Sequence, residues 1–107
     1  MKEEKYVIPP KIYEMAKELS NLYEKMYMQV RPDALYIMAR NVRNVNYIET
    51  TLDRLLDIPT DKSYELFILL CDYYMTIDKE AAKFYLDSYE ELYGEEEPKA
   101  KKKTIRD

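Results

Sequence analysis

Histidine is absent from this 107-residue sequence, which also contains only one glycine, Gly94, and one cysteine, Cys71. Histidine is the usual general base near neutral pH and, together with cysteine, the usual ligand of catalytic zinc. Phosphate-binding loops are built from several glycines. The chain therefore lacks the parts of most catalytic sites. We expect a protein that is not an enzyme and that requires no metal and no cofactor.

Long apolar runs are absent as well. The longest stretch without a charged or strongly polar residue has about six residues, at 66–71, whereas a membrane-spanning helix needs roughly 20. The charged segment 2–5 at the N-terminus does not resemble a signal peptide. A single cysteine cannot form an internal disulfide and is compatible with a reducing compartment. We therefore expect a cytoplasmic protein with no membrane partner.

Charge is unevenly distributed along the chain. Residues 1–57 contain nine basic and nine acidic side chains, residues 58–97 contain three and eleven, and residues 98–107 contain five and one. A balanced first half is thus followed by an acidic second half and a basic tail, and the net charge is −4.

Apolar residues recur at spacings of three and four along most of the chain, which is typical of amphipathic α-helices. The first stripe follows Pro9 and Pro10, and proline is well placed in a first helical turn. Pro32, which has no N–H to donate to the preceding turn, predicts the end of this helix and the start of a second one. The residues of the first stripe, which we expect to lie in the core, are Ile12, Met15, Ala16, Leu19, Leu22, Tyr23, Met26 and Val30.

The second helix is predicted to run to about residue 57. The third follows it, with Thr60 or Asp61 as N-cap. It is apolar around most of its circumference, which indicates either the middle of the bundle or a surface that binds a partner. Asp78 is expected to cap the fourth helix, and Gly94 to end it in the left-handed conformation. The core series of the second helix is Leu35, Met38, Val42, Val45, Ile48, Leu52, Leu55 and Leu56.

These patterns predict one all-α domain, a compact four-helix bundle of two longer and two shorter helices. The bundle is assigned to residues 9–94. Residues 1–8 are expected to be a flexible segment, and residues 95–107 a charged tail that is disordered. A chain of this length buries roughly 60–70% of its extended surface, which is enough for one core and not for two.

Tyrosine is abundant, with 12 copies. Its ring buries a large apolar area while its hydroxyl stays in water, which suits protein interfaces and equally the rim of a small core. We predict that the third and fourth helices bind another protein, or a second copy of this chain, through a tyrosine-rich and acidic surface. The residues assigned to it are Tyr64, Tyr73, Tyr74, Tyr85, Tyr89, Tyr93, Asp72, Asp87 and Glu90.

An adaptor, an accessory factor and an inhibitor all fit such a surface. Carboxylates fixed on rigid helices can compete with nucleic acid for the basic groove of a nucleic-acid-binding protein. Some families of small inhibitors from phages and mobile elements act in this way. No motif of the chain resembles one of these families, so the class is assigned from the acidic helices alone.

The alternative function is nucleic-acid binding. Arg40 and Arg43, and likewise Asn41 and Asn44, lie three residues apart, which gives adjacent positions on one face of the expected second helix. Arginine binds phosphate through its fork of donors, and asparagine can pair with an adenine edge. Arg54 and the basic tail would enlarge this surface. In the other interpretation, these residues pair with the acidic half of the chain.

Two single residues also invite a chemical interpretation. Glu49 falls at a core heptad position, where it could be partly buried and paired with Arg54 or Arg31. With Asp53 one turn later it could also contribute to a carboxylate metal site, but such sites in helical bundles use histidine as well. The favoured interpretation places Ile48 in the core and Glu49 outside, because a straight helix drifts against a seven-residue repeat. Cys71 lies in the most apolar segment, has no histidine to activate it, and is expected to be a buried core residue.

Overall fold

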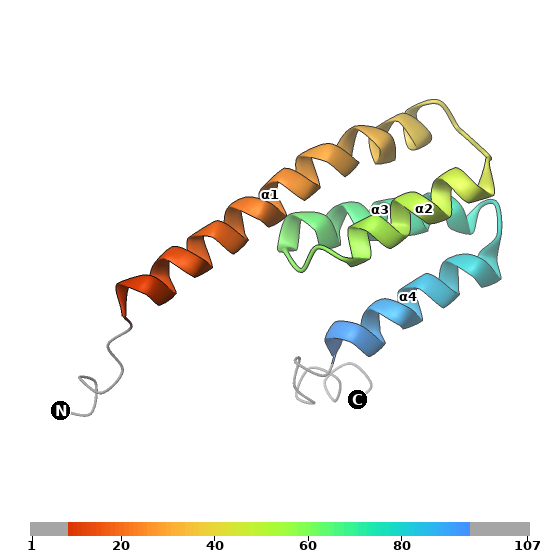
Figure 1. The fold of residues 1–107 in the computed structure, drawn as a ribbon. Helices are drawn as coiled ribbons and strands as arrows, with labels where there is room; N and C mark the ends of the chain where they lie inside the picture. Colours follow the sequence, from red (N-terminus) through yellow and green to blue (C-terminus); the bar gives the residue numbers. More distant parts are fainter. Residues whose placement is uncertain (1–8, 95–107) are drawn as a thin grey trace.

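The structure, a computed structural model, describes residues 9–94 and contains over this range four α-helices and no strand (Figure 1). They are α1 (Pro10–Ala39), α2 (Val45–Leu56), α3 (Asp61–Met75) and α4 (Lys79–Tyr93). The predicted all-α bundle is confirmed. It has one helix of 30 residues and three of 12, 15 and 15, in place of two longer and two shorter ones. The segments predicted to be flexible, 1–8 and 95–107, lie outside the described residues.

The helix starts follow from local sequence. Pro10 occupies the first turn of α1, where its missing N–H leaves no bond unmade. The side chains of Asn44, Thr60 and Asp78 each accept a hydrogen bond from the backbone N–H three residues later, at the starts of α2, α3 and α4. The predicted caps at Thr60 and Asp78 are therefore confirmed.

Pro32 does not end α1, contrary to the sequence-based prediction. The helix continues through it to Ala39, and a short connection, residues 40–44, leads to α2. A proline inside a helix costs about 3 kcal/mol. This cost is offset by packing, because Val30, Ala34 and Ile37, on both sides of Pro32, are fully buried.

The end of α4 also differs from the prediction. Gly94 has φ −63° and ψ −31°, in the right-handed helical region, and its N–H donates to the carbonyl of Glu90. The helical turn thus continues through the glycine. Among the described residues, Asn41 in the α1–α2 connection is the non-glycine residue with a positive φ, 51°, and asparagine tolerates that conformation better than most residues.

The core lies around α3, which contacts α1, α2 and α4. The central position, the first of the two alternatives predicted for this helix, is confirmed by burial of Leu66, Phe67, Leu70, Cys71 and Tyr74. From α2, the predicted core residues Ile48, Leu52, Leu55 and Leu56 are buried. Two other members of that predicted series, Leu35 and Val45, are exposed, because the single helix expected there is two helices with a turn between them.

The first half of α1 extends beyond the other three helices (Figure 1). A 30-residue helix is about 45 Å long, whereas helices of 12–15 residues reach only about 18–23 Å. The predicted core residues Ile12, Met15, Leu19 and Leu22 consequently keep 46–56% of their surface exposed, and Ala16 among them is exposed as well. Their assignment to the core was wrong, because the neighbouring helices end before they reach this stretch. We call residues 10–22 the arm.

Within residues 9–94, none of the helices combines the length and the apolar content that crossing a bilayer requires.

Candidate protein-binding site

Two tyrosines that the sequence assigned to the binding surface are buried in the core. Tyr74 is completely buried, and its hydroxyl donates a hydrogen bond of 2.6 Å to Oε2 of Glu49. Tyr85 is also buried, and the carboxylate of Asp53 on α2 is near its hydroxyl. Burial first, and then the neighbouring carboxylate, raises the pKa of both phenols well above the usual range. Neither tyrosine is accessible to a partner, so this part of the prediction was wrong.

Two further tyrosines are half-buried and hold backbone carbonyls. The Tyr73 hydroxyl donates to the carbonyl oxygen of Val42 at 2.7 Å, and the Tyr93 hydroxyl donates to that of Leu56 at 2.6 Å. Val42 lies in the connection that leads into α2, and Leu56 is the last residue of that helix. Tyrosines from α3 and α4 therefore fix both ends of α2. Tyr73 thus has a structural role, whereas the ring of Tyr93 also packs against the ring of Tyr89.

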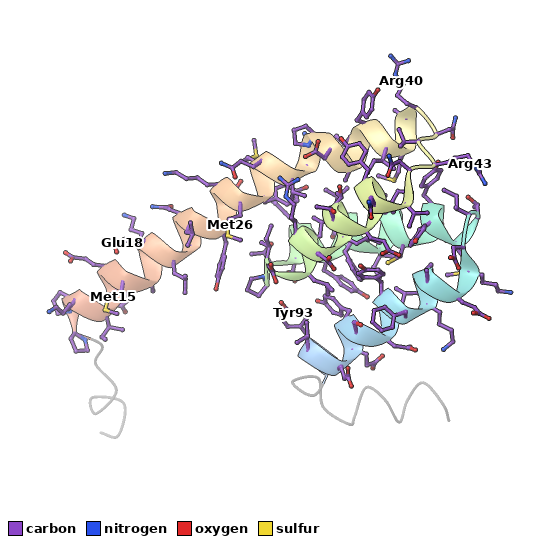
Figure 2. All side chains as sticks on the ribbon, turned by 45° about the vertical axis from the view of Figure 1, so that its right-hand side comes forward. Met15, Glu18, Met26, Arg40, Arg43 and Tyr93 are labelled. Atoms are coloured by element: carbon purple, nitrogen blue, oxygen red, sulfur yellow. The ribbon has the colours of Figure 1, made fainter. Side chains whose placement is uncertain are left out.

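The rings of Tyr64, Tyr89 and Tyr93 form a row across the seam between α3 and α4. The ring centroids of Tyr64 and Tyr89 are 4.6 Å apart, and those of Tyr89 and Tyr93 are 4.7 Å apart. Spacings of this size are typical of favourable aromatic pairs. In Figure 2, Tyr93 is labelled at the C-terminal end of α4, which is one end of the row.

This tyrosine row lines a groove of about 380 Å³ between α3 and α4. Ile68 and Leu86 add apolar surface, and Asp61 and Glu90 add carboxylates. We call this feature the tyrosine groove. Its lining contains no basic residue, so it combines aromatic faces with negative charge. The residues that line it are Asp61, Tyr64, Ile68, Leu86, Tyr89, Glu90, Tyr93 and Gly94.

The two helices that form the groove are acidic overall. Residues 61–94 contain eight carboxylates, all on exposed residues, and three lysines, a net charge of −5. Two of the lysines are paired: Lys62 lies 3.3 Å from Glu24, and Lys83 lies 3.3 Å from Asp87. Exposed ion pairs of this kind contribute about 1 kcal/mol or less.

Of the three acidic residues assigned from the sequence, Glu90 lines the groove, whereas Asp72 and Asp87 do not. Sequence reasoning missed Asp61, Ile68 and Leu86. A signal for them existed. Residues 61, 64 and 68, and likewise 86, 89 and 93, are spaced by three and four, which places each set on one face of its helix. The spacing alone does not indicate that these two faces lie next to each other in the fold.

The residues proposed for nucleic-acid binding do not form one helical face. Arg40, Asn41, Arg43 and Asn44 belong to the α1–α2 connection, and Asn44 is occupied as the N-cap of α2. The guanidinium of Arg40 lies 5.8 Å from the ring centroid of Tyr36. Figure 2 shows Arg40 and Arg43 at the end of the bundle that lies away from the arm, with their side chains pointing in different directions.

Arg54 lies elsewhere, on α2, where it is part of an α1–α2 contact. Its Nη1 is 2.9 Å from Oδ2 of Asp33, and its Nη2 donates to the carbonyl of Gln29 at 3.4 Å. The hydroxyl of Tyr47 donates to the other oxygen of Asp33 at 2.7 Å. These two donors, the Tyr47 hydroxyl first, lower the pKa of Asp33. Arg54 therefore pairs with an acidic residue of the chain, though one in α1 rather than in the acidic half.

The single cysteine and Glu49 occupy the core and its margin. Cys71 is buried, and burial, with a smaller effect of Asp72, raises the pKa of its thiol to about 12. Its expected place in the core is confirmed. Ile48 is buried as expected, but Glu49 is half-buried beside Tyr74 instead of pointing fully outward. Over residues 9–94, no three histidine, cysteine or carboxylate side chains converge in a way that would hold a metal ion.

No family model, curated protein or solved structure matches this chain. Its function is therefore inferred from the geometry of the molecule alone.

Proposed function

We propose that this chain is a non-enzymatic protein-binding module and that the tyrosine groove, formed by two acidic helices, binds a basic segment of another protein. The observation that carries the proposal is the row of Tyr64, Tyr89 and Tyr93 beside the carboxylates of Asp61 and Glu90. The one thiol, Cys71, is buried and protonated, which supports a role in binding rather than covalent chemistry.

An arginine side chain fits this chemistry best. Its planar guanidinium attracts aromatic faces, with about 0.5–2 kcal/mol per contact, and its fork of donors pairs with carboxylates. A groove of about 380 Å³ is at the lower end of the range for binding clefts, roughly 300–1,000 Å³. It accommodates one or two side chains of a segment rather than a large body. The partner is thus a protein with an exposed arginine-bearing segment.

The net charge of −5 on α3 and α4 acts at longer range. An acidic surface raises the association rate with a basic partner, and salt screens this effect beyond a Debye length of roughly 10 Å at 0.1 M ionic strength. We therefore expect association to slow as salt is added. A basic groove of a nucleic-acid-binding protein meets these requirements, and an inhibitor from a phage or mobile element is the narrower form of the proposal.

A titration of the full-length ¹⁵N-labelled protein tests the groove directly. The probes are two short peptides of otherwise identical sequence, one with arginine and the other with its uncharged isostere citrulline in the same place. With the arginine peptide, we expect amide shifts concentrated at Tyr64, Tyr89 and Glu90, and much weaker shifts with citrulline. Shifts spread evenly over the exposed carboxylates, or equal shifts with both peptides, would contradict the proposal.

Matched variants separate the groove from the rest of the surface. Glu90→Gln should lower the affinity for the arginine peptide about two- to fivefold, which is the effect expected for loss of one exposed ion pair. Tyr64→Ala should weaken it about tenfold through loss of a ring face. Glu80→Gln, on the same helix, and Tyr36→Ala, an exposed tyrosine on α1, are the controls and should leave affinity unchanged. Affinity purification from the source organism with the Tyr64→Ala and Tyr36→Ala baits would then identify the natural partner.

Nucleic-acid binding is the alternative proposal. The observation in its favour is that Arg40 and Arg43 are both exposed in the same connection. Against it stand the pairing of Arg54 with Asp33 and the acidic surface of α3 and α4. Binding of a labelled duplex at two salt concentrations decides between them. A steeply salt-dependent affinity that Arg40→Ala and Arg43→Ala reduce would favour the alternative, and no binding at low salt would remove it.

A further inference from the structure

The arm carries an apolar face that no other part of the described chain covers. Ile12, Met15, Leu19 and Leu22 recur at the three–four spacing, and each keeps about half of its surface exposed. The side chains of this stretch, including Met15 and Glu18, stand clear of the other helices in Figure 2. Four neighbouring half-exposed aliphatic side chains on one helix face form a contiguous patch, which on a soluble protein marks an interaction surface.

The charges of the arm and the turn that follows it lie off this face. Three lysines and three glutamates balance along this stretch, so it has no net charge, and none of the six falls within the apolar face. A partner held by charge, such as nucleic acid, has nothing to bind here. An anionic membrane surface is also a poor fit, because helices that lie on such membranes are rich in lysine and arginine. The six charged residues are Lys11, Glu14, Lys17, Glu18, Glu24 and Lys25.

The same face of α1 becomes the core face further along the helix. Val30, Ala34 and Ile37 continue the stripe and are fully buried against the bundle. Between the two stretches, Tyr23, Met26 and Tyr27 are half-buried at the edge of the bundle, which we call the shoulder. A helix of about 13 residues is marginal on its own in water, so an apolar partner along the arm would also stabilise its helical structure.

We propose that the partner is a second copy of this chain and that the two arms pair antiparallel about a two-fold axis. The antiparallel orientation follows from the shared face. In a parallel pair, the two bundles would occupy the same space, because each bundle covers the continuation of its own arm's apolar face. In an antiparallel pair, the bundles lie at opposite ends. Ile12 of one copy then lies opposite Leu22 of the other, and Ala16 near the axis permits close approach.

The area available limits the strength of this pairing. The exposed parts of the four arm side chains amount to roughly 300–400 Å² per copy, less than half of the roughly 800 Å² that each partner of a stable complex buries. Antiparallel arms reach only the edge of the partner's shoulder, where the half-buried Tyr23 adds a small area, so the interface stays below the standard size. An interface of this size predicts a weak and reversible dimer.

Sedimentation equilibrium of the full-length protein over about 1–200 µM tests the proposal. We expect a monomer–dimer equilibrium that Leu19→Glu weakens at least about 30-fold, because each dimer contains two copies of the altered position. Leu69→Glu is the matched control. Leu69 is 55% exposed but lies on α3, so this variant should leave the equilibrium unchanged. Circular dichroism of both variants should retain the helical signal, since neither residue is part of the core.

A monomer at every concentration would overturn the proposal, and so would a dimer that Leu69→Glu weakens more than Leu19→Glu. A monomer whose arm instead binds vesicles containing anionic lipid would assign the face to a membrane surface and equally overturn it. Cross-linking tests the orientation. A mixture of Ile12→Cys and Leu22→Cys chains should form the mixed disulfide readily, and Ile12→Cys alone should not form one. The native Cys71 does not interfere because it is buried. The opposite pattern would contradict antiparallel pairing.

Discussion

Removal of one oxygen atom, by Tyr74→Phe, should destabilise the bundle measurably. Tyr74 is completely buried in α3, and its ring stays in place in the variant, so apolar packing is conserved. What is lost is the 2.6 Å hydrogen bond from the hydroxyl to the carboxylate of Glu49 on α2. The perturbation therefore isolates one polar contact between two helices.

The expected magnitude follows from the charge of the acceptor. Hydrogen bonds to charged groups contribute about 1.5–3 kcal/mol, and neutral ones about 0.5–1.5 kcal/mol. Glu49 is only half-buried, so water can replace part of the lost bond. We expect Tyr74→Phe to lower the free energy of unfolding by about 1.5–2 kcal/mol. This is a substantial part of the roughly 5–15 kcal/mol that stabilises a typical domain.

Urea unfolding followed by circular dichroism measures this change, with Tyr36→Phe as the control because Tyr36 is about half exposed. A double-mutant cycle with Glu49→Gln isolates the pair. In the Glu49→Gln background the acceptor is a neutral amide oxygen, so Tyr74→Phe should cost about 1 kcal/mol less than in the wild type. Equal costs in both backgrounds, or a cost no larger than that of Tyr36→Phe, would refute the reasoning.

Three further outcomes are expected. The pKa of Asp33 is lowered in the folded chain from 3.8, so the contribution of this carboxylate to stability is complete above that pH and is lost as the pH falls through the folded pKa. Asp33→Asn should therefore flatten the profile of unfolding free energy against pH below about pH 4. The change should be about 1 kcal/mol or less, because the Asp33 and Arg54 side chains are 35% and 41% exposed. Urea unfolding at several acidic pH values checks this, and an unchanged profile would contradict it. Cys71, with a buried thiol and a pKa raised to about 12, should react with a disulfide reagent near pH 8 only as fast as the chain opens, and labelling without added denaturant at the rate of a free thiol would show that it is accessible. Gly94→Ala should leave the stability unchanged or raise it by up to about 1 kcal/mol, as measured by thermal unfolding. Gly94 has right-handed helical dihedral angles, and an added Cβ meets only the Glu90 side chain, at 3.0 Å. Clear destabilisation would indicate a left-handed cap instead.

The features that could be predicted from sequence are those decided within a few residues. Thr60 and Asp78 cap the helices that follow them because the donor lies three positions away. The central place of α3 could also be predicted, because a helix that is apolar around most of its circumference has few other stable locations.

Where the prediction failed, a distant contact decided the outcome. The three–four spacing of Ile12, Met15 and Leu19 is the same as that of Val30, Ala34 and Ile37, yet only the second set is covered by other helices. Periodicity gives the direction of an apolar face but not the length of the neighbours that cover it. Pro32 illustrates the same limit, since its local cost as a helix breaker is outweighed by burial on both sides.

The candidate site was partly predictable for a related reason. Tyr85, Tyr89 and Tyr93 form one row along α4, and the sequence treated them alike. In the fold, the hydroxyls of Tyr85 and Tyr93 reach α2, whereas Tyr89 stacks on Tyr64 of α3. The same face of α4 contacts both α2 and α3, and the positions of these two helices depend on the packing of the whole bundle.

The unequal reach of α1 and its neighbours has a dynamic consequence. Consecutive helices in the chain are neighbours in space, a topology of local contacts that favours fast folding of the bundle. Amide hydrogens near Ile37 should then exchange with solvent only when the whole domain unfolds, whereas those near Tyr13 should exchange through fraying of the helix end. A single helix would thus contain both strongly protected and weakly protected amides. Because pairing of the arms would stabilise them, the first protected amide would lie closer to the N-terminus as the protein concentration rises.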